Sequence, residues 1–389
     1  MKEGNHMVEF AYKNPTKLIF GKNKISQLKK ELEQYGKRLL LVYGGGSIKR
    51  TGLYDSIMTE LEGFDVFELS GVEPNPRVTT AQKGADMIKE HKIDVVLAVG
   101  GGSVIDCTKL IVAAAYYDGP AWDIVIGKHK PTQAVPFGTI LTLAATGSEM
   151  NSGSVITNID TNEKLGWGNP LVYPAFSILD PTYTFTLPEH QTVNGIVDMM
   201  SHLIEQYFNE ATNTTVQDGM IEGVLRAIIE TAPKVIDNPT DYDARETLML
   251  AGTVALNGSL RWGYSGDWST HNIEHAVSAY YDIAHAQGLA IIMPNWMSYV
   301  MPKHVDRFEK FAKNVFGIQK VTAFDTAKAG IDALRAFWTS LNAPSTLAQV
   351  EIDDTKLKEM TEHCMIYGTF GRLEPLGYDD ALAILKMSL

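Results

Sequence analysis

The sequence has few cysteines, no long apolar run and no excess of positive charge. Only Cys107 and Cys364 occur in 389 residues, which excludes a disulfide framework and favours a reducing compartment. No window reaches the roughly 18 apolar residues that a membrane-spanning helix needs. The formal net charge of −12 disfavours nucleic acid and anionic membranes as partners, because both attract basic surfaces. The polar first residues lack the apolar core of a signal peptide, so we expect a cytoplasmic protein.

The pattern of apolar residues differs between the two halves of the chain and predicts two domains, residues 1–187 and 188–389. In the first half, apolar strands alternate with amphipathic helices, which predicts an α/β domain with a parallel sheet covered on both faces. Strands are predicted over 38–45, 65–72, 93–103, 137–149 and 175–181, with helices over 56–64 and 79–92. From Thr192 onward, apolar residues recur every three and four positions, which predicts an all-helical half. Its clearest helices are predicted over 219–236, 244–258 and 322–341.

Two of the predicted strands end in Gly-Gly-Gly-Ser, at residues 44–47 and 100–103. Glycines let a backbone approach a phosphate, and the start of a following helix offers free N–H groups. Ser103 can cap the helix expected after the second of these loops, and Asp106 lies in the first turn of that helix. Neither loop has the G-x-G-x-x-G dinucleotide fingerprint, so a tight turn is the alternative interpretation of either loop. Two such loops in one sheet favour phosphate binding.

A third loop, LAATGSEMN over 143–151, supplies the short polar side chains of Thr146, Ser148 and Asn151. Such side chains suit contacts to a phosphate, a ribose or a carboxamide. Together with the two glycine loops, this segment predicts a bound nucleotide.

Histidines cluster in the helical half. Asp198 and His202 are four residues apart and share a helical face, His271 and His275 have the same spacing, and His285 follows a short break. These five side chains predict a divalent metal site, because burying them without a common partner would be costly. The alternative is that each histidine is hydrogen-bonded singly in the core. Spacing favours His271 and His275 as co-ligands, and it does not decide which of the three histidines is left free.

Ordered motifs span nearly the whole chain: NPTKLIFG, YGGGSIK, GVEPNP, AVGGGSVID, TLAATGSEMN, LDPTYTFTLP, NGIVDMMSHLIEQY and HNIEHAVSAYYDIAHAQGLAI. By these motifs the chain resembles the iron-containing (group III) alcohol dehydrogenases, and among them the butanol dehydrogenase and NADPH-dependent aldehyde reductase branch. The resemblance implies an N-terminal parallel-sheet dinucleotide-binding domain and a C-terminal all-helical metal-binding domain, the fold shared with dehydroquinate synthase. It also implies a homodimer.

The resemblance assigns roles to the clustered side chains. It implies that His275 lies beside the nicotinamide as a catalytic residue, whereas the metal ligands are Asp198, His202, His271 and His285. Iron is the first expectation for the metal and zinc the second. The implied contacts to the cofactor pyrophosphate are Gly101, Gly102 and Ser103. Along the rest of the cofactor, the implied contacts are Asn75, Thr142, Thr146, Asn151 and Lys164.

The choice between the two nicotinamide cofactors is expected to depend on the first glycine loop. Gly45, Gly46 and Ser47 follow the strand where an acidic residue would bind the ribose hydroxyls of NAD, and Lys49 and Arg50 come close behind. Glycines leave space for a 2′-phosphate, Ser47 can donate to it, and the two cations attract it. This loop therefore favours NADP(H), with NAD(H) as the alternative.

The predicted activity is reversible hydride transfer between NAD(P)H and a short-to-medium primary alcohol or aldehyde, such as butanol and butyraldehyde. A metallohydrolase with the same histidine and aspartate metal site is the alternative, and the glycine loops would then be turns only. Relatives of the same fold that act on phosphorylated substrates need basic residues, and the metal motifs here have few Lys and Arg nearby. The expected partner is a small alcohol or aldehyde.

Overall fold

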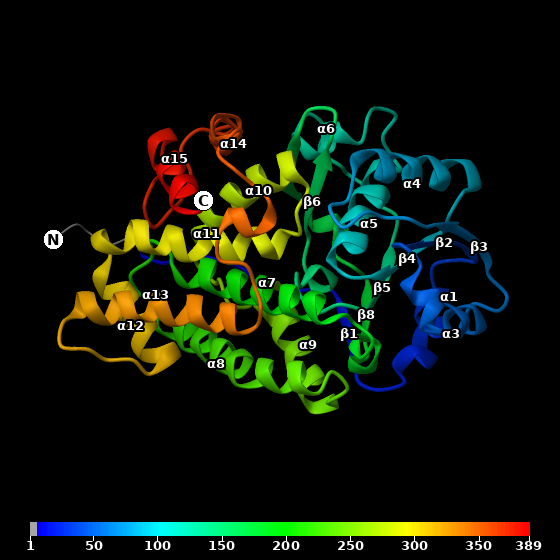
Figure 1. The fold of residues 1–389 in the computed structure, drawn as a ribbon. Helices are drawn as coiled ribbons and strands as arrows, with labels where there is room; N and C mark the ends of the chain where they lie inside the picture. Colours follow the sequence, from blue (N-terminus) through cyan, green and yellow to red (C-terminus); the bar gives the residue numbers. More distant parts are fainter. Residues whose placement is uncertain (1–5) are drawn as a thin grey trace. The chain divides into compact units, whose positions relative to one another are not determined.

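Six parallel strands form the main sheet of the computed structural model, which describes residues 6–389 (Figure 1). The strand order is β1-β8-β5-β4-β2-β3, and every neighbouring pair is parallel. The strands of this sheet are β1 (Lys17–Phe20), β2 (Arg38–Tyr43), β3 (Asp65–Leu69), β4 (Val95–Gly100), β5 (Phe137–Leu141) and β8 (Phe176–Leu179). Two further strands, β6 (Gly153–Asn158) and β7 (Glu163–Gly168), form an antiparallel hairpin.

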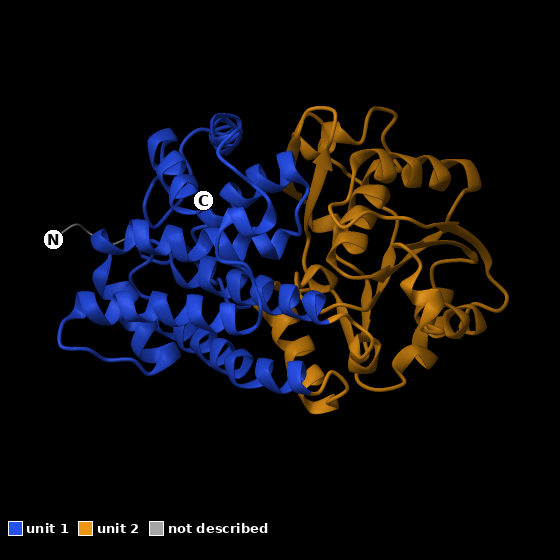
Figure 2. Ribbon diagram, viewed as in Figure 1, with its two compact units in different colours: residues 1–12, 189–237, 258–389 blue, residues 13–188, 238–257 orange. Residues whose placement is uncertain are grey.

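The chain divides into two compact units (Figure 2). One unit, residues 13–188 and 238–257, contains the sheet; the other contains residues 6–12, 189–237 and 258–389. The helices of the sheet unit are α1 (Leu28–Glu33), α2 (Ser47–Arg50), α3 (Leu53–Glu60), α4 (Val78–His91), α5 (Gly102–Ala114), α6 (Trp122–Val125) and α9 (Tyr242–Leu256). The helices of the second unit are α7 (Glu189–Tyr207), α8 (Thr215–Asp237), α10 (Ser269–Tyr281), α11 (His285–Val300), α12 (Val305–Phe316), α13 (Ala323–Ser340), α14 (Leu357–Cys364) and α15 (Tyr378–Met387).

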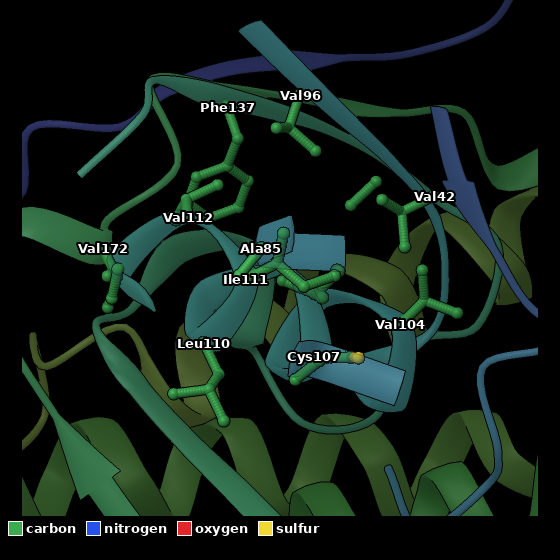
Figure 3. Packing of buried hydrophobic residues seen from close by; sticks show 14 of the residues in the cluster. Val42, Ala85, Val96, Val104, Cys107, Leu110, Ile111, Val112, Phe137 and Val172 are labelled. Atoms are coloured by element: carbon green, nitrogen blue, oxygen red, sulfur yellow. The ribbon is translucent and has the colours of Figure 1, made fainter. Parts of the chain in front are cut away.

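The sheet is buried on both faces because its strands are apolar at successive positions. Leu40 and Val42 of β2 belong to one buried cluster, with residues of α4 and α5 (Figure 3). Leu39 and Leu41 belong to a second cluster, with residues of α1 and α3. Side chains of a strand alternate between the faces, so a continuous apolar run fills two cores at once. This confirms the predicted parallel sheet with helices on both faces.

Several predicted elements have different limits in the structure. The strand predicted over 137–149 ends at Leu141, because a loop and a 3₁₀-helix at Ser148–Met150 follow it. The helix predicted over 56–64 is α3, which begins at Leu53 and ends at Glu60. The short strand β1 and the β6–β7 hairpin are absent from the sequence-based prediction.

The C-terminal half is helical as predicted, from Glu189 onward. Helix α9 nevertheless groups with the sheet unit, where the Thr253 hydroxyl donates to Glu149 at 2.6 Å. The domain limits 1–187 and 188–389 stay a prediction. Within residues 6–389, no helix combines the length and the apolar character that spanning a bilayer would require.

Candidate active site

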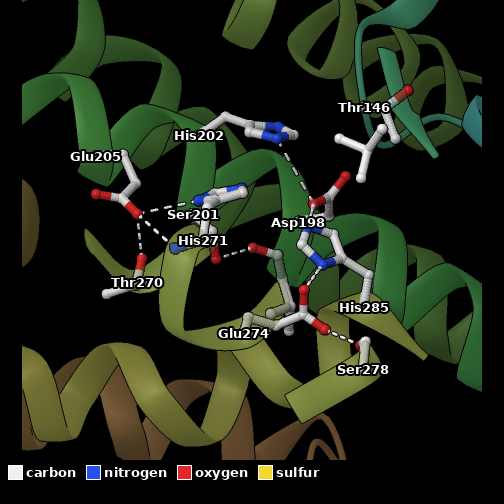
Figure 4. Close-up of polar contacts among 12 residues, drawn as sticks. Thr146, Asp198, Ser201, His202, Glu205, Thr270, His271, Glu274, Ser278 and His285 are labelled. Atoms are coloured by element: carbon white, nitrogen blue, oxygen red, sulfur yellow. Dashed lines mark hydrogen bonds and ion pairs between the residues drawn. The ribbon is translucent and has the colours of Figure 1, made fainter. Parts of the chain in front are cut away.

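The aspartate and three of the predicted histidines converge from three helices (Figure 4). Asp198 and His202 lie one turn apart on α7, with 3.7 Å between Asp198 Oδ1 and His202 Nε2. His285 of α11 brings its Nε2 to 3.7 Å from the same carboxylate oxygen. The His271 ring of α10 lies 5.0 Å from the His202 ring, centroid to centroid. The four side chains that the resemblance assigns as ligands therefore face one another.

A break between two helices places His285 beside the others. Helix α10 ends at Tyr281, and Asp282 takes a left-handed conformation, φ 50°. The chain turns over three residues, and His285 is the first residue of α11. The short interruption that the sequence shows between 281 and 285 is thus the turn that returns the chain to the cluster.

The chemistry of these donors fits a divalent cation. Among residues 6–389, buried atoms without a hydrogen-bond partner include both carboxylate oxygens of Asp198 and Nε2 of His271. Burial lowers the pKa of His202 to about 4, although the charge of Asp198 opposes the shift, so its ring is neutral at pH 7. Asp198, His202 and His271 offer ligand atoms within 4.8 Å of one another. Carboxylate oxygen and neutral imidazole nitrogen together suit iron or zinc.

Two buried glutamates orient the histidines, and the sequence analysis missed both. Glu205 accepts from Nδ1 of His271 at 3.0 Å, and Glu274 accepts from Nδ1 of His285. A carboxylate on Nδ1 leaves the Nε2 lone pair for a metal, which is the usual second layer of a histidine site. The signal was present in the sequence, because each glutamate follows a predicted ligand, His202 or His271, by three residues.

Glu274 also needs space on the neighbouring helix. A Cβ at Gly288 of α11 would come within 2.7 Å of Glu274 Cγ, so only glycine fits there without a shift. The Ser278 hydroxyl of α10 donates to the same carboxylate. The space left by Gly288 and the hydrogen bond from Ser278 thus keep the Glu274 carboxylate beside His285.

His275 lies beside this cluster. Its ring is 5.6 Å from His285 and 6.4 Å from His271, centroid to centroid. The structure groups His271 with Asp198 and His202, whereas His275 groups with Glu274 and His285. The pairing of His271 with His275 that spacing favoured is therefore not the arrangement in the structure. The role of His275 stays a prediction.

In the sheet unit, the predicted cofactor loops follow three adjacent strands. β2, β4 and β5 are parallel neighbours, so their carboxyl ends meet at one edge of the sheet. A Cβ at Gly102 would overlap the Thr146 side chain, and one at Gly101 would come within 3.2 Å of Leu143 Cβ. Thr142, in the same loop, donates its N–H to Gly100 O at 3.1 Å. The second glycine loop and the 142–151 loop are thus in direct contact.

The first glycine loop is open. A Cβ on Gly45 or Gly46 would meet no atom within 4 Å, and Gly46 has φ +90°, which favours glycine. Ser47 begins α2 directly after this loop. Beside it, the Lys49 ammonium lies 3.8 Å from the Glu68 carboxylate, which the sequence analysis did not consider. Glu68 also accepts from the hydroxyls of two tyrosines, Tyr43 at 2.7 Å and Tyr54 at 2.5 Å.

Asn75, Ser103 and Lys164 gather around the segment before α4. The Ser103 hydroxyl donates to Pro74 O, directly before the buried Asn75. Lys164 is buried in β7 and pairs with Thr157 of β6. The N–H of Thr157 donates to the carbonyl of Pro76, the residue after Asn75, at 2.8 Å.

Three of the predicted cofactor contacts form hydrogen bonds to other residues of the protein: Asp106, Ser148 and Asn151. Asp106 accepts from the Ser148 hydroxyl at 2.5 Å and from the N–H of Val155 at 2.8 Å. The Asn151 side chain accepts from Lys109 at 2.8 Å. Their predicted contacts to the cofactor stay predictions.

The comparisons with known proteins agree across the chain. Residues 15–181 match the family model described as iron-containing alcohol dehydrogenase, and 192–389 match its Fe-containing alcohol dehydrogenase C-terminal counterpart. The "Probable NADH-dependent butanol dehydrogenase 1" of Bacillus subtilis (strain 168) is 58% identical, over 98% of this chain and 100% of its own. The NADPH-dependent aldehyde reductase YqhD of Escherichia coli (strain K12) is 38% identical, over 92% and 94%.

Solved structures show the same fold. The crystal structure of NADH-dependent butanol dehydrogenase A from Thermotoga maritima has a TM-score of 0.95 and 39% identity, covering 98% of this chain and 99% of that one. The chain belongs to the iron-containing alcohol dehydrogenase family. Within it, the chain falls in the butanol dehydrogenase branch, and the predicted fold class is confirmed.

Proposed function

We propose that this protein is a metal-dependent alcohol dehydrogenase and aldehyde reductase, acting on short-to-medium primary alcohols and their aldehydes with NAD(P)H. The observation that carries the proposal is the convergence of Asp198 with three imidazoles, two of them held by buried carboxylates. The relatives named as butanol dehydrogenases and aldehyde reductase support the same reaction. None of the relatives supports the metallohydrolase alternative.

The proposed metal ligands are Asp198, His202, His271 and His285. When bound, a divalent metal supplies Lewis acidity toward the substrate oxygen, with iron the first choice by family and zinc the second. Glu205 and Glu274 keep the Nδ1 protons on their histidines, so the Nε2 atoms remain available as donors. A bound nicotinamide would supply the hydride for aldehyde reduction, and His275 would provide the proton to the carbonyl oxygen.

The cofactor lies, in this proposal, at the carboxyl edge of β2, β4 and β5. Gly101 and Gly102 let the backbone approach the pyrophosphate, and the start of α5 offers N–H groups to it. Thr142, Thr146 and Lys164 contribute polar groups at the same edge.

For the nicotinamide, we propose that both cofactors bind and that NADH is preferred, against the NADP(H) expected from the glycine loop. The space beside Gly45 and Gly46 admits a 2′-phosphate. However, the ion pair with Glu68 partly neutralises Lys49, so the cation attracts a phosphate less. The Bacillus subtilis relative is named as probably NADH-dependent and the Thermotoga maritima protein as NADH-dependent, whereas the Escherichia coli reductase is named as NADPH-dependent.

A spectrophotometric assay tests the proposal. The purified protein, reconstituted separately with Fe²⁺ and Zn²⁺, is mixed with butyraldehyde and either NADH or NADPH, and loss of the reduced nicotinamide absorbance is followed. Stoichiometric butanol should form, and a chelator should abolish the rate. Aldehyde-independent ester or amide hydrolysis with no nicotinamide consumption would contradict the proposal. The homodimer and the cytoplasmic location stay predictions.

A further inference from the structure

A buried lysine connects helix α5 with the loop that follows β5. Lys109 has no exposed surface, and its ammonium donates to Ser148 Oγ at 2.7 Å, Asn151 Oδ1 at 2.8 Å and Gly153 O at 2.7 Å. Three donors meet three acceptors, so the charge is fully hydrogen-bonded without solvent.

Two carboxylates accompany this ammonium. Asp106 lies one turn earlier on α5 and accepts from the Ser148 hydroxyl, and the buried Glu149 accepts from Thr253. Burial lowers the pKa of Lys109 to about 8, while Asp106 and Glu149 oppose the shift. At neutral pH the side chain is therefore mostly charged.

The network reaches the glycine loop through Thr146. The N–H of Ser148 donates to Thr146 Oγ1 at 3.1 Å, and Asn151 Nδ2 donates to Gly147 O at 2.9 Å. Gly147 has φ +62°, and a Cβ there would lie 3.1 Å from a backbone oxygen of α9, so this turn has little freedom. Thr146 in turn packs directly against Gly102 at the start of α5. Lys109 thus connects the middle of α5 to the loop that covers its first turn.

We propose that Lys109 is a positioning residue for cofactor binding: its ammonium holds the 142–151 loop, through Ser148 and Asn151, in the arrangement that places Thr146 beside Gly102. The inference rests on the proposed function. It gives Asp106, Ser148 and Asn151 a role in the cofactor site that needs no direct contact with the nucleotide.

The test compares Lys109→Met with Ser154→Ala. Ser154 is a matched control, because its buried hydroxyl donates to the Asp106 carbonyl at 2.9 Å and is no part of the ammonium's shell. Dissociation constants for NADH and NADPH are measured by nicotinamide fluorescence, below and above about pH 8, together with KM, kcat and metal content.

Lys109→Met should raise the nucleotide dissociation constant at least about tenfold. This is the change expected when only about a tenth of the molecules keep the loop in the arrangement that binds the nucleotide. KM for the nucleotide should rise more than kcat falls, with metal content and Ser154→Ala unchanged. Wild-type affinity should weaken as pH rises through about 8, where the ammonium loses its proton, and Lys109→Met should lack this dependence.

Equal nucleotide affinity in Lys109→Met and wild type would overturn the role of Lys109. Should that variant not fold, Asn151→Ala removes one acceptor of the ammonium instead, and wild-type nucleotide affinity in a folded Asn151→Ala would overturn the proposal equally. Wild-type protein that binds neither nucleotide would instead overturn the proposed function.

Discussion

Replacing Glu205 with glutamine changes one oxygen to an amide nitrogen and removes one buried charge. In the structure, Glu205 Oε1 accepts from the Thr270 hydroxyl and from both N and Nδ1 of His271, each of these two at 3.0 Å. Its Oε2 accepts from the backbone N–H of Trp268 at 2.7 Å. If the glutamine oxygen takes the place of Oε1, it can accept the hydrogen bonds from Thr270 and from both nitrogen atoms of His271. Its NH₂ group then takes the place of Oε2 and faces the Trp268 N–H, so two donors oppose each other.

The expected effect is a loss of metal affinity. A hydrogen bond to a charged acceptor is about twice as strong as a neutral one, so the His271 ring is held less firmly and becomes a weaker donor. Changes to such outer carboxylates cost about 10- to 100-fold in metal affinity, or about 1.4 to 2.7 kcal/mol. Glu205 is fully buried, so no solvent replaces the lost charge, and we expect the upper part of this range.

Competition between the purified protein and a chelator of known affinity measures this effect for Zn²⁺ and Fe²⁺. Glu222→Gln is the matched control, because Glu222 is also buried but bonds Tyr207 and Asn314, neither of which is a proposed ligand. Circular dichroism verifies that each variant is folded. A folded Glu205→Gln variant with the metal dissociation constant of wild type would refute the assignment of Glu205 to the metal site.

Three further predictions concern individual side chains of the two sites. Alanine at any proposed ligand should remove most of the metal, measured by elemental analysis, whereas His275→Ala should retain metal and lose rate; a metal-free His275→Ala would contradict its role. Gly102→Ala should displace Thr146 and weaken nucleotide binding, whereas Gly223→Ala on α8 should not, because its Cβ meets no atom within 4 Å and it lies outside the predicted cofactor loops; equal affinity in both would remove Gly102 from the site. Glu68→Gln should raise the preference for NADPH by releasing Lys49, and Gly45→Asp should lower it; binding ratios unmoved by either change would show that this loop does not read the 2′-phosphate.

Local patterns predicted much of the fold. The apolar strand over 95–100 and the spacing in α13 follow from the residues themselves, since periodicity reports burial directly. The hairpin β6–β7 was missed because its stability comes from outside it: Asp106 of α5 accepts from the Val155 N–H, and Ser154 donates to the Asp106 carbonyl. A pattern confined to neighbouring residues does not contain such contacts.

The same limit applies to the candidate site. The proposed ligands were visible because metals restrict residue type to side chains such as His and Asp at short helical spacings. Glu205, Glu274 and Lys109 were not singled out: the two glutamates do follow predicted ligands by three residues, but a single charged residue in an amphipathic helix predicts an exposed face. Only packing shows that all three are buried.

These buried charges explain why the helical cluster suits a cation. Asp198, Glu205 and Glu274 place three carboxylates in one buried region. Isolated buried carboxylates cost several kcal/mol each unless paired, and Glu205 and Glu274 accept hydrogen bonds from histidine rings and hydroxyl groups. A divalent cation would offset most of this charge, so its binding and the stability of the helical unit should be coupled. Ala276 and Ala286 beside the histidines are buried, and apolar neighbours that keep water sparse would strengthen the interaction between these carboxylates and a bound ion.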